Sequence, residues 1–416
     1  MSVLRAESVT KIFGRRAAEA QRKLKAGADS QAIRDLGVTA AVADASFEVN
    51  EGEIFVVMGL SGSGKSTLIR TLNGLLGVTS GSVEIDGQDI ARMSPKALRA
   101  IRQNKISMVF QHFALFPHRT VLANAAYGLE VRGVPKEQRE KTAREFLELV
   151  GLEGWEDKVP GQLSGGMKQR VGLARALASG TDIILMDEAF SALDPLIRRE
   201  VQDLLLDLQS KFGKTIVFIT HDLNEAMRIG DRIAVMREGR IVQIGTAEEI
   251  LTDPANDYVA QFVADVDRTR VLTASSVMEK PLVTVLSTTG PRTALRTMRE
   301  AQTSAAFVVG RDRKLIGRVR ATVIADAVQD NVQKLDGLID PEDPEPVAPD
   351  TPVADLFVRC AESDLPVPVA DEEGTLVGVI PRVTLLAALG AINTQVDDVV
   401  DEPELALTKE GRGGDD

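Results

Sequence analysis

The stretch "IFVVMGLSGSGKSTLIRTL", residues 54–72, is the strongest indication of the fold of the first part of the chain. Five apolar residues open it, as in a buried parallel strand, and a segment of helical period closes it. Between them, residues 59–67 fit the pattern G-x-x-x-x-G-K-[ST], which requires a strand before it and a helix after it. Its glycines let backbone N–H groups turn inward around a polyphosphate, and the helix N-terminus adds partial positive charge. The stretch therefore predicts a phosphate-binding loop at the head of an α/β domain.

Each residue of this loop is a candidate ligand of a nucleotide. Lys65 is expected to reach the β and γ phosphates, and the Ser66 hydroxyl is expected to ligate Mg²⁺. The complete predicted set is Gly59, Leu60, Ser61, Gly62, Ser63, Gly64, Lys65, Ser66 and Thr67.

Short apolar runs alternate with longer segments of helical period on both sides of the loop, up to "RIVQIGT". This alternation is typical of a mostly parallel sheet with covering helices. Strands are predicted at residues 54–58, 106–110, 182–186, 215–219 and 232–236. Residues 121–179 contain no comparable strand and include a predicted helix at 136–150. We therefore expect a helical subdomain at about residues 112–179, inserted into the α/β domain.

An acidic pair, Asp187 and Glu188 in "DIILMDEAF", stands at the carboxyl end of a predicted buried strand. Ligands of open parallel sheets bind outside the carboxyl ends of the strands. Unpaired buried carboxylates are costly, so a purely structural role explains this pair poorly. We expect Asp187 to lie next to Mg²⁺ and Glu188 to polarise the attacking water.

A second glycine-rich turn opens "LSGGMKQRVGLARALA", residues 163–178, and offers another backbone site for anions. One bound nucleotide does not need two phosphate sites, unless the second serves a partner's nucleotide. Here the sequence resembles the ATP-binding cassette (ABC) family, whose signature is LSGG-x. In that family two cassettes pair head to tail, and the signature of one closes on the ATP of the other. The resemblance implies that Ser164, Gly165 and Gly166 contact the γ-phosphate across a dimer interface.

The remaining motifs of the ABC family lie before and after this signature, in the order typical of the family, within residues 1–265. By resemblance, Gln111 contacts Mg²⁺ and water, Asp194 of "SALD" lies at the dimer contact, and His221 binds the γ-phosphate. A lone histidine after a strand is more often structural, but its place after Asp187 in this motif order favours the catalytic role. Phe13 corresponds to the aromatic residue that stacks on adenine, with a core aromatic as the alternative. The catalytic candidates are thus Glu188, His221, Lys65 and Gln111, and the Mg²⁺ candidates are Ser66, Gln111 and Asp187.

A narrower resemblance rests on "EGEIFVVMGLSGSGKST", on "SGGMKQR" with Met167 where many ABC ATPases carry Gln, on "MDEAFSALDPLIR" and on "HDLNEAMRIGDRIAVM". Together with a helical insert, these stretches look like the ATPase subunit of glycine betaine/proline betaine importers. The resemblance implies an ATPase that drives a membrane permease served by a periplasmic or extracellular solute-binding protein. It places the chain at the cytoplasmic face of the inner (cell) membrane, held there by the permease.

The insert occupies residues 15–43, between "VTKIFG" and "ADASFEV". Its Ala, Arg, Lys and Gln favour helix, Gly27 interrupts the helical run, and Asp29 and Gly37 suit the caps of a second short helix. We predict a pair of helices. The insert could have a purely structural role or serve as a docking surface, and the sequence leaves both alternatives open.

A composition change near residue 271 begins a second domain, rich in β-branched residues and Pro-containing joins. The region repeats itself with an offset of 61 (352 − 291), which relates Pro291 to Pro352 and Gly317 to Gly378. Its hairpins "AFVVGRDRKLIGRV" and "VPVADEEGTLVGVI" resemble those of CBS domains, a small β-α-β-β-α fold. We expect CBS units at residues 271–330 and 345–392 and an acidic tail without fixed structure at 393–416. The predicted fold is thus a P-loop ABC domain, with mostly parallel sheet, antiparallel β and helical subdomains, followed by an α+β tandem CBS module.

The signal that such a module reads is open. Many CBS pairs hold adenosine with a Thr or Ser followed by an Asp three residues later, but this chain has Arg320 and Val323 in one copy and Pro381 and Thr384 in the other. Related importers respond to osmotic or ionic conditions, and some bind cyclic di-AMP. The first hairpin gathers five basic residues that could contact anionic lipid or the acidic tail: Arg311, Arg313, Lys314, Arg318 and Arg320. We hypothesise that the module inhibits transport at low ionic strength; a module that only dimerises is the alternative.

Composition excludes several other classes of protein. The net charge of −12 argues against general binding to nucleic acid, and the lone Cys360, expected in the core, excludes an internal disulfide. No apolar run approaches the roughly 18 residues of a membrane helix. Two alternatives remain: an ABC importer for an amino acid or another small solute, and a soluble ABC ATPase without a transport role.

Overall fold

The computed structural model describes residues 2–28, 30–264, 271–340, 345–363 and 365–390. It divides into two compact units, Met1–Val266 and Asp267–Asp416, which are described separately. The predicted acidic tail at 393–416 lies outside the described residues. In the part of the chain that is described, no helix is both long enough and apolar enough to span a bilayer.

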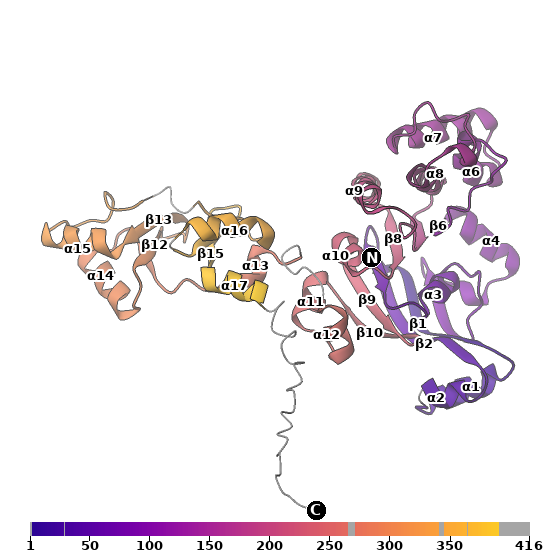
Figure 1. The fold of residues 1–416 in the computed structure, drawn as a ribbon, viewed down its shortest axis with the longest axis horizontal. Helices are drawn as coiled ribbons and strands as arrows, with labels where there is room; N and C mark the ends of the chain where they lie inside the picture. The colour runs from indigo at the N-terminus through magenta and orange to yellow at the C-terminus, as the bar shows by residue number, and fades with distance from the viewer. Residues whose placement is uncertain (1, 29, 265–270, 341–344, 364, 391–416) are drawn as a thin grey trace, which may run out of the picture. The chain divides into compact units, whose positions relative to one another are not determined.

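The first unit contains two sheets and the helices around them (Figure 1). Its elements are β1 (Ser2–Phe13), α1 (Ala17–Lys25), α2 (Ser30–Arg34), β2 (Thr39–Asn50), β3 (Ile54–Met58), α3 (Lys65–Leu72), β4 (Ser80–Ile85), β5 (Gln88–Asp89), η1 (Ile90–Arg92), α4 (Pro95–Asn104), β6 (Ile106–Phe110), α5 (Val121–Ala125), α6 (Tyr127–Val131), α7 (Lys136–Leu149), η2 (Pro160–Gln162), α8 (Gly165–Ala178), β7 (Ile183–Asp187), α9 (Pro195–Phe212), β8 (Thr215–Thr220), α10 (Leu223–Ile229), β9 (Arg232–Arg237), β10 (Arg240–Gly245), α11 (Ala247–Thr252) and α12 (Asp257–Phe262).

The larger sheet has the strand order β10-β9-β3-β8-β7-β6. All neighbouring pairs are parallel except β9 and β10. The strands predicted at 54–58 and 106–110 have those bounds, whereas the one predicted at 182–186 runs one residue later, as Ile183–Asp187. In this sheet Phe110 pairs with Asp187, and Asp187 pairs with Ile219. The carboxyl ends of β6, β7 and β8 therefore meet at one edge.

A second, antiparallel sheet of order β2-β1-β4-β5 joins the same core. Helix α3 contributes Leu68, Ile69 and Leu72, each 0% exposed, to a cluster that contains residues of both sheets. Burying each of these side chains stabilises the fold by about 1.5–3 kcal/mol. The rings of Phe47 and Phe55 stack at 5.0 Å and connect β2 with β3. This packing fixes α3, and with it the loop that precedes it.

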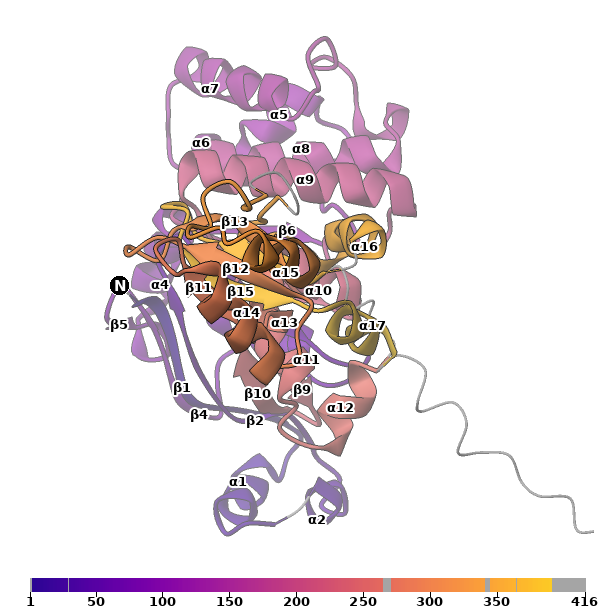
Figure 2. The ribbon, with the colours of Figure 1, turned by 90° about the vertical axis from the view of Figure 1, so that its left-hand side faces the viewer.

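Residues 121–178 fold as the predicted helices, and the helix predicted at 136–150 is α7. The helices α5, α6, α7 and α8 gather on one side of the unit, apart from the strands of the antiparallel sheet (Figure 2). Ala143 and Leu147 of α7 are buried, as are most apolar residues of α8.

The inserted segment does form two helices, which lie at the ends of β1 and β2 (Figure 1). Ala20 of α1 and Ile33 of α2 are buried with Ile12 of β1 and Val38. Gly37 adopts φ +70° and donates its N–H to Arg34 O, as expected for the end of α2, while Asp29 lies outside the described residues. The predicted end at residue 43 is wrong, because β2 begins at Thr39, where the strand pairs with β1.

The second unit contains the repeat. Its elements are α13 (Ala274–Val277), β11 (Thr284–Leu286), α14 (Pro291–Glu300), β12 (Ala305–Val309), β13 (Leu315–Arg320), α15 (Ala321–Gln329), α16 (Val353–Glu362), β14 (Val367–Ala370), β15 (Leu376–Ile380) and α17 (Arg382–Gly390). Each copy has its own buried cluster, and Leu272, Ala274 and Val277 belong to the cluster of the second copy, with Cys360.

The two hairpins of the second unit meet at their tips. Leu315 N donates to Gly374 O, and Leu376 N donates to Arg313 O. The basic tip of the first hairpin therefore runs beside the acidic tip of the second, where Glu372 and Glu373 are exposed. Of the five predicted basic residues, four are exposed; Arg318 is 2% exposed and its backbone pairs with Asp340. The prediction that Arg318 belongs to the exposed basic cluster is therefore wrong.

Candidate functional site

The phosphate-binding loop owes its shape to glycines that no other residue can replace without strain. Gly64, at the N-cap of α3, adopts φ +104°, and a Cβ there would collide with the Ala41 carbonyl oxygen. Gly59 follows β3 directly, and a Cβ on it would collide with the Met236 carbonyl oxygen. The Gly239 N–H donates to Ser63 O at 2.9 Å and ties the turn after β9 to the loop. The loop is thus held between β2 and β9.

Lys65 is 4% exposed, yet it carries a charge that needs partners. Its Nζ donates to Gly59 O at 2.8 Å and to Leu60 O at 3.1 Å, which curls the loop around the ammonium group. Burial lowers the pKa of Lys65, and the Glu188 and Asp187 carboxylates oppose that shift. A buried ammonium at the head of a helix is a suitable partner for an anionic phosphate.

Asp187 and Ser66, two of the predicted Mg²⁺ ligands, lie within hydrogen-bonding distance of each other. Ser66 Oγ donates to Asp187 Oδ1 at 2.9 Å, and the side chain of Asp187 is 7% exposed. Arg70 Nη2 lies 3.6 Å from the other carboxylate oxygen. A hydroxyl and a carboxylate at this spacing are hard oxygen ligands of the kind that Mg²⁺ prefers, so these two side chains fit the expected metal.

Glu188 is held at the edge of the sheet by three neighbours. His221 Nδ1 lies 3.3 Å from Glu188 Oε2, and Gln111 Nε2 donates to the same oxygen at 3.3 Å. Glu188 has φ +47°, a left-handed conformation that costs a non-glycine residue about 1–3 kcal/mol. Ser191 Oγ donates to the Glu188 carbonyl at 2.9 Å and supports that conformation. Three predicted site residues, which directly follow β6, β7 and β8, therefore converge.

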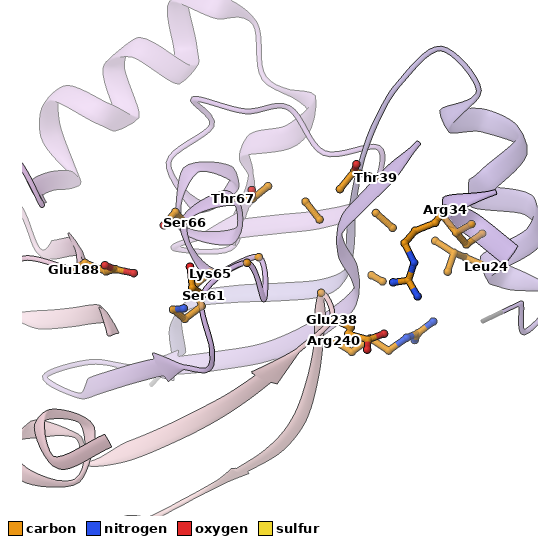
Figure 3. Close-up of a pocket in the computed structure, with 17 residues that line it drawn as sticks. Leu24, Arg34, Thr39, Ser61, Lys65, Ser66, Thr67, Glu188, Glu238 and Arg240 are labelled. Atoms are coloured by element: carbon orange, nitrogen blue, oxygen red, sulfur yellow. The ribbon is translucent and has the colours of Figure 1, made fainter. Parts of the chain in front are cut away.

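A cavity of about 430 Å³ opens in front of the loop (Figure 3). Its volume falls within the roughly 300–1,000 Å³ typical of small-molecule sites. The predicted residues that line it are Ser61, Gly62, Gly64, Lys65, Ser66, Thr67 and Glu188. Phe13, which is 41% exposed, does not line it, but Thr39, its direct partner across the β1–β2 pair, does.

The LSGG turn and Asp194 lie at the starts of two helices. Ser164 is the N-cap of α8 and accepts a hydrogen bond from Met167 N, and Asp194 caps α9 by accepting one from Ile197 N. Gly166 packs where a Cβ would meet Ile197 Cγ2 at 2.4 Å, which joins α8 to α9. None of these residues lines the described cavity of the same chain.

Sequence reasoning missed an ion pair behind the site. Arg198 of α9 lies 2.9 Å from Asp222, the residue after His221, and its Nη2 donates to Leu193 O. Nearby, Gln202 donates to Glu225, and burial raises the pKa of the Glu225 carboxyl against opposing hydrogen bonds. No motif links α9 to the loop after β8, so only tertiary packing reveals these contacts.

A phosphate-binding loop, an acidic pair at the sheet edge and an LSGG turn capping a helix define a nucleotide-binding cassette. The family model described as ABC transporter matches residues 42–191, and the model of the CBS domain matches residues 274–330 and 339–391. The chain is 51% identical over 398 residues to the glycine betaine/carnitine transport ATP-binding protein GbuA of Listeria monocytogenes, covering 95% of this chain and all of that protein. The chain belongs to the family of ATP-binding subunits of ABC transporters, in the branch that carries tandem CBS domains.

Other similar proteins support the same family assignment. The glycine betaine transport ATP-binding protein OpuAA of Bacillus subtilis is 49% identical, with 95% of this chain and 94% of that protein covered. The ATP-binding protein ProV of the glycine betaine/proline betaine system of Salmonella typhimurium is 47% identical, with 93% and 97% covered. Among solved structures, the dimeric ATP-binding cassette MJ0796, bound to ADP and phosphate after hydrolysis, superposes with a TM-score of 0.50 at 33% identity, over 59% of this chain and 98% of that one. The predicted family, fold class and ATPase activity are confirmed.

Proposed function

We propose that this ATPase energises the import of a quaternary amine such as glycine betaine or proline betaine through a separate membrane permease. The proposal rests on one observation above all: the relative named for glycine betaine and carnitine transport matches the chain from the cassette through the CBS units, at 51% identity. Relatives named for methionine import match only 55% of the chain. The quaternary-amine assignment is therefore favoured over an amino-acid importer.

Hydrolysis in this proposal proceeds by in-line attack of water on the γ-phosphate. Glu188 is the general base, and its carboxylate is kept at the edge of the sheet by Gln111 and His221. Lys65 places positive charge where the β and γ phosphates lie and stabilises the charge that develops there. His221 Nδ1 and Gln111 Nε2 share one oxygen of Glu188, which leaves its other oxygen for the water.

Ser66 and Asp187 are proposed to hold Mg²⁺, with Gln111 beside them, and Phe13 to stack on adenine. The metal, when bound, neutralises charge on the phosphate oxygens. Ser164, Gly165 and Gly166 of a second copy complete the site, with Asp194 at the contact between the two cassettes. A dimeric cassette among the solved structures supports this arrangement.

The other proposed partners follow from the importer role. A permease holds the ATPase at the cytoplasmic face of the cell membrane, and a periplasmic or extracellular solute-binding protein delivers the cargo. Nucleic acid is not a proposed partner, because the chain has a net charge of −12.

Co-purification with the permease and its solute-binding protein, followed by a ligand-binding screen, tests the cargo. We expect the solute-binding protein to bind glycine betaine or a related quaternary amine and to stimulate ATP hydrolysis when loaded with it. Stimulation by amino acids alone would show that the cargo is wrong.

The CBS module is proposed to inhibit transport at low ionic strength. Four exposed cations, Arg311, Arg313, Lys314 and Arg320, lie on the first hairpin, whose tip runs beside acidic residues of the second. Attraction between such charges, or between the cations and anionic lipid, acts over a Debye length of about 8 Å at 0.15 M salt and about 3 Å at 1 M. Rising salt would therefore release the inhibited state. Cyclic di-AMP is the other ligand proposed for this module.

Uptake by the reconstituted transporter in vesicles containing anionic lipid tests this gate. We expect deletion of residues 271–416, or exchange of the four exposed cations for Gln, to give high uptake even at low salt. The matched control exchanges four exposed cations elsewhere in the same unit, Arg292, Arg296, Arg299 and Lys334, for Gln, and should keep the salt dependence. Unchanged salt dependence in both the deletion and the first exchange would contradict the gate.

A further inference from the structure

The cavity in front of the phosphate-binding loop has a wall that no motif of the cassette supplies. Leu24 of α1 and both Ile33 and Arg34 of α2 line it, together with Thr39, Glu238 and Arg240. Leu24, Ile33 and Arg34 all belong to the inserted helix pair. The insert is thus part of the nucleotide cavity as well as an appendage of the sheet.

The insert is held in place by a small core of its own. Ile33 is 1% exposed and packs with Ala20, Ile12 and Val38, while Leu24 is partly buried against the same cluster. Arg34 is exposed to the cavity, and its guanidinium is oriented by Gln31, whose Oε1 accepts hydrogen bonds from Nε at 3.2 Å and Nη2 at 3.0 Å. The wall therefore combines a fixed apolar surface with a positioned, planar cation.

The position of this wall indicates which part of the nucleotide it meets. Ser61, Lys65 and Ser66 lie toward one end of the cavity, with Glu188 beyond them, and Leu24 and Arg34 lie at the other end (Figure 3). The γ-phosphate must approach Glu188, so the rest of the molecule extends toward the insert. The base and ribose are the parts of ATP that reach this far from the loop.

We propose that the inserted helix pair forms a base-side subsite of the ATP site, which rests on the ATP site of the proposed function. Leu24, supported from behind by the buried Ile33, covers apolar surface of the adenosine, and the Arg34 guanidinium donates hydrogen bonds to acceptors on the base or ribose or stacks on the base. The subsite adds to the stacking proposed for Phe13, the last residue of β1, which does not line the cavity. It gives the insert a direct role in nucleotide affinity.

Comparison of ATP with tripolyphosphate, which lacks the base and ribose, tests this subsite in the full-length chain. We expect Arg34→Ala to weaken the binding of MgATP about tenfold, as for the loss of a charged hydrogen bond, and to leave the binding of Mg-tripolyphosphate unchanged. Gln31→Ala should weaken MgATP binding in the same direction by less, because Arg34 keeps its charge but loses its orientation. The matched control is Arg22→Ala, an exposed cation on α1 that does not line the cavity, and it should leave both ligands unaffected.

Thermal melting of each variant shows that the chain is folded before binding is measured. Unchanged MgATP affinity in a folded Arg34→Ala variant would overturn the subsite. An equal loss for tripolyphosphate would also overturn it, because Arg34 would then act on the phosphates. If the unaltered chain bound tripolyphosphate but gained no affinity from the base, the subsite would fail while the phosphate site stood. If it bound neither ligand, the proposed function would fail as well.

Discussion

At the scale of single residues, the candidate site contains two adjacent carboxylates, Asp187 and Glu188, whose surroundings differ. Asp187 is buried and hydrogen-bonded by Ser66, whereas Glu188 turns into the cavity in a left-handed conformation beside His221 and Gln111. The two neighbours in sequence therefore face different partners. That difference fits the proposed roles, in which Asp187 serves a metal and Glu188 serves a water.

Replacing Glu188 with Gln removes the proposed base and keeps its size and hydrogen-bonding shape. We predict that ATP hydrolysis by the assembled transporter falls about 100-fold or more, while MgATP binding is retained. Steady-state hydrolysis and equilibrium binding measure the two effects. Glu148→Gln, an exposed change on α7, should leave both unaffected. A normal rate in Glu188→Gln would show that another group is the base.

Glu225 yields a prediction of pH dependence. Its pKa is raised by burial above the ordinary value of 4.5, so between that value and the folded pKa the folded chain binds a proton that the unfolded chain has released. Stability therefore falls as pH rises through this window. We predict that Glu225→Gln raises Tm at pH 8 and that the gain shrinks to nothing as the pH falls toward 4.5.

Calorimetry across pH 5–8 measures this gain, since 1 kcal/mol shifts Tm by about 2–4 °C in a domain of 150–250 residues. Glu145→Gln on the exposed face of α7 is the control and should change Tm little at any pH. A gain for Glu225→Gln that grew as the pH fell would contradict the raised pKa.

Motifs predicted the residues of the site where local sequence determines position. The loop, the acidic pair, Gln111 and His221 each end or follow a strand of one sheet, so parallel register alone brings them together. Arg34 carries no such signal, because its place depends on how the insert packs against β1 and β2. Arg318 looked exposed in a basic run, yet its place in β13 turns it inward.

At the scale of elements, helix α3 and its loop behave as one unit. Gly64 begins the helix with φ +104° and has no space for a Cβ against Ala41, whereas Gly62, with φ +81°, has no atom near its Cβ position. Both glycines avoid backbone strain, but only Gly64 is also packed against another strand. Substitution at Gly62 therefore tests backbone strain alone, whereas substitution at Gly64 tests strain together with a steric clash.

Alanine at each position tests this distinction. We predict that Gly62→Ala lowers stability by about 1–2 kcal/mol, the cost of a left-handed alanine. Gly64→Ala should lower it further, because the clash is with the backbone of β2, which must shift. Denaturant unfolding of both variants measures the difference. Equal losses would show that β2 does not constrain the loop.

The strands and helices themselves were largely predictable, because runs of apolar residues and helical period mark them. Errors fell at boundaries: β7 begins one residue later than predicted, and the insert ends before Thr39 instead of at residue 43. Both boundaries depend on partner strands. Thr39 joins β2 because it pairs with Phe13, a contact that its neighbours in sequence do not encode.

At the scale of the whole molecule, the LSGG turn does not line the described cavity of its own chain. Gly165 at the start of α8 has only Leu193 Cδ2 near its Cβ position, at 3.8 Å, so a side chain fits there in the monomer. We predict that Glu188→Gln forms a dimer with MgATP in sedimentation experiments, and that adding Gly165→Asp abolishes the dimer without lowering Tm. A monomer at saturating MgATP in Glu188→Gln, or a dimer that survives Gly165→Asp, would contradict the head-to-tail pairing.

ATP-driven uptake of glycine betaine is the most direct test of the central claim. The measurement uses vesicles reconstituted with this chain, its permease and its solute-binding protein, with ATP on the side of the cassette. We predict uptake that requires ATP and is lost in Glu188→Gln. ATP-driven uptake of an amino acid in place of glycine betaine, or undiminished uptake in Glu188→Gln, would contradict it.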